Sequence, residues 1–352
     1  MLLVDLSAIL RTSGIAWLTW ALLPGCTSTS PSTAPAVMRE SESATLGHVE
    51  QLTTPVMGFD KAGEAYYSPD MGRIIFQAVP SGGQHYQMYV MALADRQPKR
   101  VSTGQGACTC GYFRPDGRKI IFASSHLGPH AGLPPDTQPA GYQAAGRRYI
   151  WDFNPYMEIF EADPDGSNLR PLTDADGYDA EGAYGPDGRR IAFTSQRSGD
   201  LEIWVMNADG SEPRQITHAK GYDGGPFISP DGRRIIFRGD RRGDDKLQIY
   251  VSDIDGRNER ALTDNDFVNW GPYWHPDGRS IIYATSRHGH QNYELYLLNI
   301  DTGKEQRATY TEGFDGLPVF SPDGKKLMWT SKRGPDNTSQ IFQADFHLPP
   351  GF

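Results

Sequence analysis

Short apolar segments alternate with turn sequences along most of the chain, and both recur at a regular spacing. A turn pattern of Pro-Asp, then Gly or Met-Gly, then Arg or Lys begins at Pro69, Pro115, Pro186, Pro230, Pro276 and Pro322. An aromatic residue stands seven positions after each proline, at Phe76, Phe122, Phe193, Phe237, Tyr283 and Trp329. Each repeat holds four segments of about 4–7 residues, too short and too rich in β-branched and aromatic residues for helices. The pattern therefore predicts four strands in every repeat.

Six such repeats account for the chain from about residue 47 to its end. Units of about 40–45 residues with four strands are typical of β-propeller blades. Because a single blade cannot cover its own faces, several blades close into a ring that leaves few exposed sheet edges. We therefore predict an all-β protein in which residues 47–352 form a six-bladed propeller of four-stranded antiparallel blades.

The two ends of this region suggest how the ring closes. The last repeat ends after its third segment, SQIFQADF, whereas VEQLT, before the first repeat, matches the pattern of a fourth strand. We predict that Val49–Thr53 pairs with Gln340–Phe346, because this pairing completes the last blade and removes two sheet edges.

The repeats also carry a family resemblance. Runs such as GPDGRRIAFTSQRSGDLEIWVMNADGSEPRQIT resemble the TolB-type propeller repeat of bacterial periplasmic proteins. The resemblance covers all six repeats and implies the propeller fold. It implies less about function, since similar propellers serve as binding modules, as lyases and as caps on peptidases. The separate amino-terminal α/β domain of TolB is not expected, because only about 20 residues lie between Cys26 and the first predicted strand.

The amino-terminal segment has the features of a targeting sequence. Gly14–Gly25 is an apolar run of 12 residues, too short to span a bilayer comfortably. Leu23–Cys26 resembles the bacterial lipobox, which implies a signal peptide over 1–25 and a lipid on Cys26. Residues 26–46 are rich in Ser, Thr and Pro and are predicted to be a flexible tether. We expect a periplasmic protein that is anchored to the outer membrane only through its lipid. The alternative is an ordinary signal peptide or a buried helix.

Composition and charge exclude several classes of protein. Lys plus Arg number 34 against 43 Asp plus Glu, which gives a net charge of −9. This balance argues against nucleic-acid binding, which needs a dense field of basic residues. Only the amino terminus holds a long apolar run, so a polytopic membrane protein is excluded. We expect a monomer.

A set of acidic and amide residues starts the predicted innermost strands of four consecutive repeats: Asp179, Asp223, Asn269 and Asp315. They are expected to converge on the channel mouth, with Glu64 and Glu181 two residues deeper. Clustered carboxylates repel one another unless a cation or basic groups offset them. One hypothesis is a socket for a small cation or a basic peptide segment. The alternative is that each side chain caps local backbone amides.

Basic loops are expected to surround this mouth. The loop between second and third strands carries Arg197, Arg241, Arg242, Arg287, Lys332 and Arg333. These residues either form a collar that contacts a ligand or make salt bridges between neighbouring blades. The second repeat has about 25 extra residues in the same kind of loop, with His126, His130, Arg147, Arg148, Tyr149 and Trp151. Long loops of this composition favour recognition, and the alternative is a mobile decoration without a binding role.

Signatures of catalysis are missing from the sequence. No GxSxG, HExxH or P-loop motif occurs. Cys108 and Cys110, two apart on a strand, are expected to face the same way, so they either pack, bind metal or pair with strain. The sequence favours a non-enzymatic binding module for a protein or peptidoglycan-associated envelope partner, with no cofactor beyond a possible cation at the mouth. The alternative is a metal-dependent lyase acting on acidic oligosaccharides.

Overall fold

The computed structural model describes residues 41–129, 131 and 153–352, which form six four-stranded antiparallel sheets. Blade 1 is made of β2 (Phe59–Tyr67), β3 (Arg73–Pro80), β4 (Gln87–Ala92) and β5 (Pro98–Arg100). Blade 2 is made of β6 (Cys108–Phe113), β7 (Ile120–Ser124), β8 (Glu158–Ala162) and β9 (Arg170–Pro171). Blade 3 is made of β10 (Asp179–Tyr184), β11 (Arg190–Ser195), β12 (Glu202–Asn207) and β13 (Arg214–Gln215). Blade 4 is made of β14 (Asp223–Ile228), β15 (Arg234–Gly239), β16 (Gln248–Asp253) and β17 (Arg260–Ala261). Blade 5 is made of β18 (Asn269–Trp274), β19 (Ser280–Thr285), β20 (Glu294–Asn299) and β21 (Glu305–Arg307). Blade 6 is made of β22 (Asp315–Phe320), β23 (Lys326–Ser331), β24 (Gln340–Phe346) and β1 (Leu46–Gln51).

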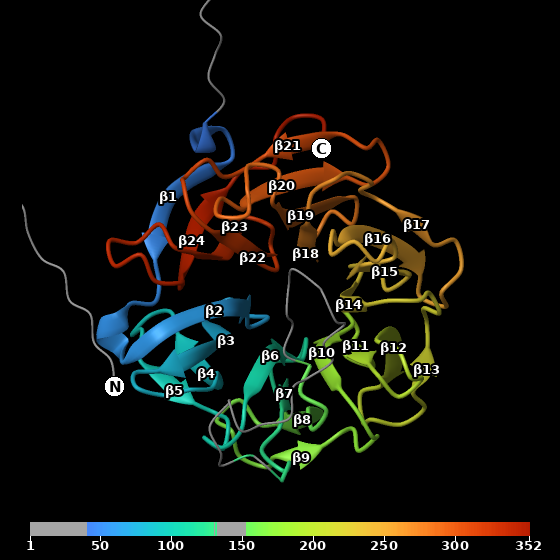
Figure 1. Ribbon diagram of the computed structural model, residues 1–352. Coiled ribbons are helices and arrows are strands. Elements are labelled where there is room, and N and C mark those ends of the chain that lie inside the picture. The colour runs from blue at the N-terminus through green and yellow to red at the C-terminus, as the bar shows by residue number, and fades with distance from the viewer. Residues whose placement is uncertain (1–40, 130, 132–152) are drawn as a thin grey trace, which may run out of the picture. The chain divides into compact units, whose positions relative to one another are not determined.

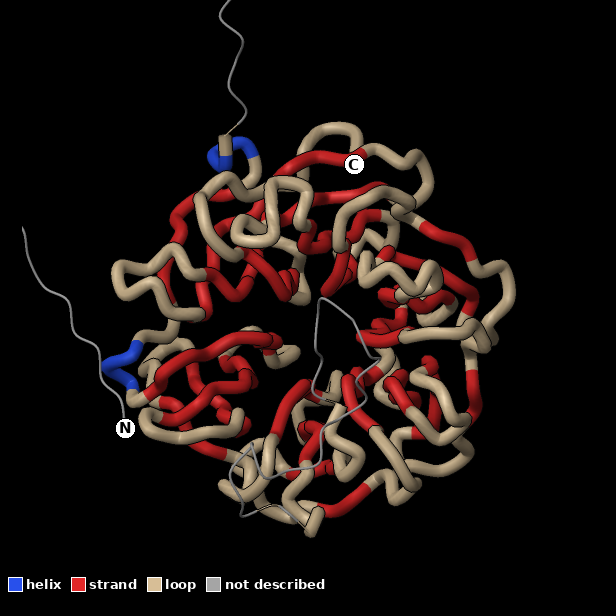
Figure 2. The backbone as a smooth tube through the Cα atoms, viewed as in Figure 1, coloured by secondary structure: helices blue, strands red, loops and turns tan. Residues whose placement is uncertain are grey.

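The six sheets follow one another around a central axis, which confirms the predicted propeller (Figure 1). The first strand of each blade lies innermost, and the strands converge on the centre of the ring (Figure 2). Neighbouring innermost strands contact one another around the ring, as β6 does with β10 and β18 does with β22. These strands therefore line the channel.

The amino-terminal strand closes the last blade, as predicted. β1 pairs with β24, where Glu50 lies opposite Gln343. The pairing continues beyond the strand, because the backbone N–H of Leu52 donates to the carbonyl oxygen of Ile341 at 2.8 Å. The hydroxyl of Thr53 accepts a hydrogen bond from the N–H of Ile341 at 2.9 Å. Segments nearly 300 residues apart in sequence thus share one sheet.

The turn that recurs in every repeat has the same structural role in each blade. The carboxylate of the turn aspartate accepts a hydrogen bond from the N–H two residues later, as Asp187 does from Arg189 at 3.0 Å. In five of the six turns the glycine has a left-handed backbone, for example Gly188 with φ of 66°; in the first turn Met71 takes that conformation. The six aromatic residues that follow the turns are at most 1% exposed and fill the interior of the blades.

The residues before β1 are only partly described. The predicted signal peptide and the tether as far as residue 40 lie outside the described residues. Glu42–Ala44 forms a short 3₁₀ helix, η1, and Glu42 is ion-paired with Arg333 at 3.0 Å. In the part of the chain that the structure describes, no helix has the length and apolar character needed to cross a membrane.

Candidate functional site

The innermost strands of blades 3, 4 and 6 each begin with a buried aspartate. Each carboxylate is ion-paired with the arginine 18 residues later in its own blade. The nitrogen–oxygen distances are 2.6 Å for Arg197–Asp179, 2.7 Å for Arg241–Asp223 and 2.8 Å for Arg333–Asp315. The predicted acidic ring and basic collar are thus two halves of one set of ion pairs within blades, an arrangement that neither sequence-based hypothesis included.

These arginines are held from a second side by aromatic rings. The guanidinium of Arg197 lies 5.2 Å from the ring centroid of Phe193, and that of Arg333 lies 4.8 Å from Trp329. Burial raises the pKa of the partner carboxyl groups, to about 6 for Asp223, and the arginines oppose this effect. The charges at the first position of the innermost strands are therefore compensated within the fold.

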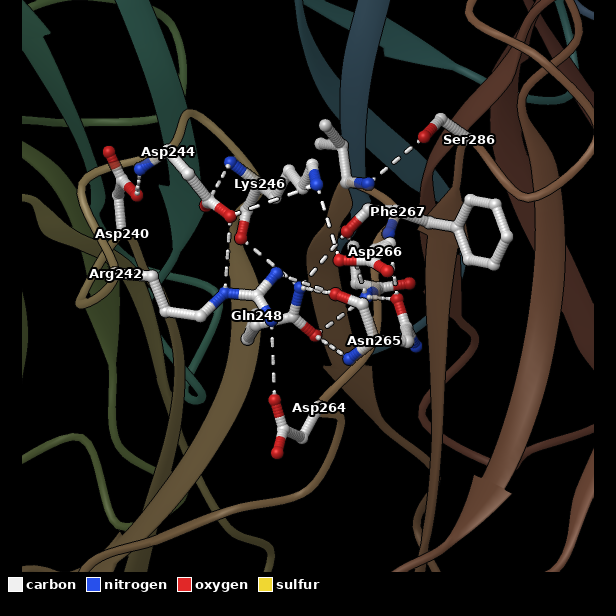
Figure 3. A network of polar contacts seen from close by, with 12 residues as sticks. Asp240, Arg242, Asp244, Lys246, Gln248, Asp264, Asn265, Asp266, Phe267 and Ser286 are labelled. Atoms are coloured by element: carbon white, nitrogen blue, oxygen red, sulfur yellow. Dashed lines mark hydrogen bonds and ion pairs between the residues drawn. The ribbon is translucent and has the colours of Figure 1, made fainter.

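Blade 5 shows what happens when the aspartate is replaced. Asn269 stands at this position, and Arg287 pairs with Glu305 instead, at 3.0 Å. The Asn269 amide donates to Gln248 Oε1 at 2.9 Å, and the Gln248 amide donates to the carbonyl of Phe267 at 3.0 Å. Figure 3 shows Gln248 at the centre of this network, in contact with the loop around Asn265. An amide pair thus replaces the carboxylate at this contact between the third strand of one blade and the innermost strand of the next, which we call a seam.

The same substitution pattern extends around the ring. The first residue of each third strand lies beside the residue of the next blade that corresponds to Asp179. It is Glu where the next blade has Asp at that position: Glu158, Glu202 and Glu294, before Asp179, Asp223 and Asp315. It is Gln where the next blade has another residue: Gln87, Gln248 and Gln340, before Cys108, Asn269 and Ala62, the last being the fourth residue of β2. Burial, together with the charge of the neighbouring aspartate, raises the pKa of each of the three glutamates to about 7. Three seams therefore hold a pair of carboxyl groups.

A β-bulge interrupts every innermost strand at its channel-facing position. The bulge residue has a left-handed backbone, with φ between 44° and 59°, in all six blades: Glu64, Cys110, Glu181, Gly225, Gly271 and Leu317. The register of the strand pairing shifts at each of these residues. Bulges re-aim side chains and are common beside functional sites. Four of the six residues are not glycine, so their backbones are strained.

All six bulge residues line one cavity of about 490 Å³ at the loop-bearing end of the channel. Its described wall includes six aromatic side chains: Tyr66, Tyr86, Tyr178, Phe227, Trp270 and Tyr273. Four charged side chains also line it: Lys61, Glu64, Glu181 and Arg238. Mostly apolar cavities with a few converging polar groups are typical ligand sites. We call this the channel cavity.

The two glutamates of the channel cavity differ in their surroundings. The carboxylate of Glu181 accepts hydrogen bonds from Thr194 (2.8 Å), Tyr222 (3.1 Å), the Gly225 N–H (2.6 Å) and Arg238 (2.8 Å). Glu64 accepts one long hydrogen bond from Tyr66 at 3.4 Å and a further one from the thiol of Cys110. Burial and the charge of Glu181 raise the pKa of Glu64 to about 7, against the smaller effect of Arg238. Glu181 is a structural acceptor, whereas Glu64 retains capacity for another donor.

The prediction that Cys108 and Cys110 face the same way is wrong. The bulge at Cys110 turns its side chain to the channel cavity, while Cys108 is fully buried. Both are free thiols. Cys108 contacts the hydroxyl of Ser124 at 3.1 Å, and that hydroxyl contacts Nδ1 of His126 at 2.8 Å. His126 is thus held at the edge of blade 2.

The opposite end of the channel has a second cavity of about 270 Å³. The prolines of all six turns line it, together with the aromatic residues beside them. Phe227 and Tyr273 line both cavities, and the hydroxyls of Tyr112 and Tyr273 lie 3.1 Å apart between them. An aromatic cluster therefore separates the two ends of the channel.

The structure leaves part of the predicted site untested. Cys26, His130, Arg147, Arg148 and Trp151 lie outside the described residues. In residues 41–129 and 153–352, no group of three His, Cys, Asp or Glu side chains is arranged so that it could hold a metal ion. Sequence reasoning missed Arg238; its one signal is that it stands where the other blades have Gln, Ala or Thr.

Comparison with known proteins agrees with this architecture. Residues 167–291 and 245–348 match the TolB beta propeller domain. No curated protein matches the chain. A putative TolB from Agrobacterium tumefaciens has a TM-score of 0.58 at 20% identity and covers 82% of this chain and 91% of its own. TolB from Acinetobacter baumannii has a TM-score of 0.58 at 22% identity, over 78% of this chain and 64% of its own.

An enzyme is similar as well. The oligogalacturonate lyase from Vibrio parahaemolyticus has a TM-score of 0.50 at 16% identity, over 84% of this chain and 93% of its own. At these identities the likeness to solved structures shows a shared fold and carries no argument about activity.

Proposed function

The chain belongs to the TolB β-propeller domain family, and we propose that it is a non-enzymatic binding module of the bacterial envelope that holds a protein or peptidoglycan-associated partner at the loop-bearing end of its channel. The observation that carries this proposal is the channel cavity, which opens among the loops and combines an aromatic wall with four charged side chains. Aromatic side chains in a concave site provide much of the energy of protein recognition.

The proposal extends to the location of the protein. We propose that Cys26 carries a lipid and that residues 26–46 connect it to the propeller in the periplasm, at the outer membrane. A lipid at the end of a flexible segment keeps the channel cavity accessible to partners near the membrane. The predicted recognition residues Arg147, Arg148 and Trp151 belong to the same proposal.

The lyase alternative has weaker support. It rests on a shared fold at 16% identity. The arginines expected to grip the carboxylates of an acidic oligosaccharide are largely engaged inside the blades, as Arg197 is with Asp179. We therefore retain the binding module as the proposed function.

An affinity capture from envelope extract tests the proposal. The immobilised wild-type propeller is compared with Trp270→Ala, in the wall of the channel cavity, and with Phe267→Ala, an exposed aromatic residue outside that cavity. We expect the partner that wild type retains to be lost with Trp270→Ala and kept with Phe267→Ala. Equal retention by both variants would show that binding does not use the channel cavity.

A further inference from the structure

We propose that the channel cavity recognises an alkyl ammonium group, such as that of a lysine side chain, and that the carboxylate of Glu64 is its counter-ion. This inference rests on the proposed function, because it names the chemistry by which the channel cavity holds its partner. It differs from the socket expected at Asp179, Asp223 and Asp315, since those carboxylates already have arginine partners.

The first argument is the unequal hydrogen bonding of the two cavity glutamates. Four donors surround Glu181, at distances between 2.6 and 3.1 Å. Among the described residues, the only oxygen or nitrogen donor to the Glu64 carboxylate is Tyr66 at 3.4 Å, near the limit of a hydrogen bond. A carboxylate accepts about four hydrogen bonds. Glu64 is therefore the group in the described wall of the channel cavity that a new donor would satisfy.

The second argument is the charge left after pairing inside the channel cavity. Arg238 lies 2.8 Å from Glu181, and both side chains are largely buried, so this pair is neutral as a unit. In the described wall, Glu64 is then the charged side chain of the interior that has no ion-pair partner. Its carboxyl group faces Glu181, Arg238, Cys110 and Tyr66 from four different strands. Glu181 makes ionisation of Glu64 unfavourable, and an entering cation would remove that penalty.

The third argument is the aromatic wall. Faces of Tyr and Trp attract cations through their quadrupole, most strongly where water is excluded. The wall already holds one ammonium group, because Nζ of Lys61 lies 4.7 Å from the ring centroid of Tyr86. Lys61 is exposed at the rim of the channel cavity, so its ammonium group does not occupy the interior beside Glu64. A rim lysine on an aromatic ring shows that this wall suits an ammonium group.

A divalent metal ion fits this wall less well than an ammonium group does. Calcium needs six to eight oxygen ligands. Glu181 is committed to four donors, and Glu64 alone supplies two oxygens. An ammonium has only three donors to satisfy, and one carboxylate with neighbouring aromatic faces meets that requirement.

The test is a calorimetric titration of the purified propeller with a blocked lysine, Nα-acetyl-lysine methylamide. The matched uncharged probe is Nα-acetyl-norleucine methylamide. We expect wild type to bind the lysine probe and not the norleucine probe. Glu64→Gln should weaken binding about tenfold or more, because it removes the charge and keeps the shape. Glu202→Gln, the same substitution at a buried seam outside the channel cavity, should leave the affinity unchanged.

Lys61→Gln gives an independent check of the sign of the charge. Removing the rim cation should tighten binding of the lysine probe about two- to threefold. Unchanged affinity with Glu64→Gln, weaker affinity with Lys61→Gln, or no binding by wild type at millimolar concentration would each overturn the proposal. If capture of the envelope partner still depends on Trp270 in any of these cases, the proposed function stands and only the ammonium recognition fails. If wild type binds the lysine probe as expected but capture of an envelope partner does not depend on Trp270, the ammonium recognition stands and the proposed function fails.

Discussion

The guanidinium of Arg238 occupies the space that a side chain at position 225 would need. A Cβ on Gly225 would lie 1.8 Å from Nη1 of Arg238. The same glycine supplies the N–H that donates to Glu181 at 2.6 Å, and its backbone is left-handed with φ of 59°. The bulge in blade 4 therefore lacks a side chain so that the ion pair between Arg238 and Glu181 can form in the channel.

This relationship predicts the effect of Gly225→Ala. The new Cβ should displace Arg238, break its pair with the buried Glu181 and lower the free energy of unfolding by about 3–5 kcal/mol. Gly271→Ala is the matched control, because Gly271 has the same φ of 59° at the same bulge position, but its Cβ would meet no atom closer than 3.7 Å. The control should cost about 1 kcal/mol, from backbone strain alone. Denaturant unfolding measures both; equal losses would show that Arg238 moves aside freely.

The closure of blade 6 predicts a large effect of the amino-terminal strand. Deleting residues 47–53 removes the partner of β24 and exposes a sheet edge. We expect the melting temperature to fall by several degrees and the unfolding transition to broaden. Deleting the described residues before it, 41–44, is the control and should have a smaller effect, since it leaves the pairing of β1 intact and removes only the contacts of Glu42 with Arg333, Tyr310 and Thr311 and the local turn. A melting temperature unchanged by the first deletion would contradict the role of β1.

The fold could be predicted from the sequence because its repeat is local. The turn proline, the aromatic residue seven positions later and the spacing of strands recur six times, so the six copies support one and the same assignment of strands. Closure by Val49–Thr53 followed from one unmatched segment at each end of the chain. These features depend on the alternation of side chains along strands, which a sequence shows directly.

The candidate site could be predicted only in part, because it depends on contacts between strands. The sequence placed Asp179 and Arg197 near the same end of the channel but did not show that they pair. The bulge at Cys110 was not visible, since a left-handed backbone at a residue other than glycine has no sequence signal. The role of Arg238 depends on Glu181, 57 residues away and in another blade.

The predicted lipid anchor is tested by a single substitution. Cys26→Ser should abolish incorporation of radiolabelled palmitate and release the protein from the membrane fraction, because it removes the thiol at which we propose acylation. Cys110→Ser is the control, since its thiol lies in the channel cavity and should leave labelling unchanged. Wild-type protein found in the soluble periplasm would show that Cys26 is not an anchor.

The carboxyl pairs between blades predict that stability falls as the pH rises. Burial, together with the charge of the neighbouring Asp223, raises the pKa of Glu202 from its ordinary value of 4.5 to about 7. The folded protein then binds more protons than the unfolded chain between about pH 4.5 and 7, so the contribution of Glu202 is lost across this window as pH increases. Glu202→Gln should remove this loss and stabilise the protein by roughly 1–2 kcal/mol at pH 8, with little effect at pH 4.5.

The reason that an amide should be tolerated is visible in the other seams. Thr217 donates to Glu202, and Thr53 donates to the amide oxygen of Gln340 at the corresponding position of blade 6, at 2.8 Å. Glutamine at position 202 therefore keeps the hydrogen bond and removes only the charge. The reciprocal change, Gln248→Glu beside Asn269, introduces a buried carboxyl group and should make stability fall with pH more steeply than in wild type. Urea unfolding of both variants from pH 4.5 to 8 decides the matter, because parallel curves for wild type and Glu202→Gln would mean that the seam carboxyl groups are not coupled to folding.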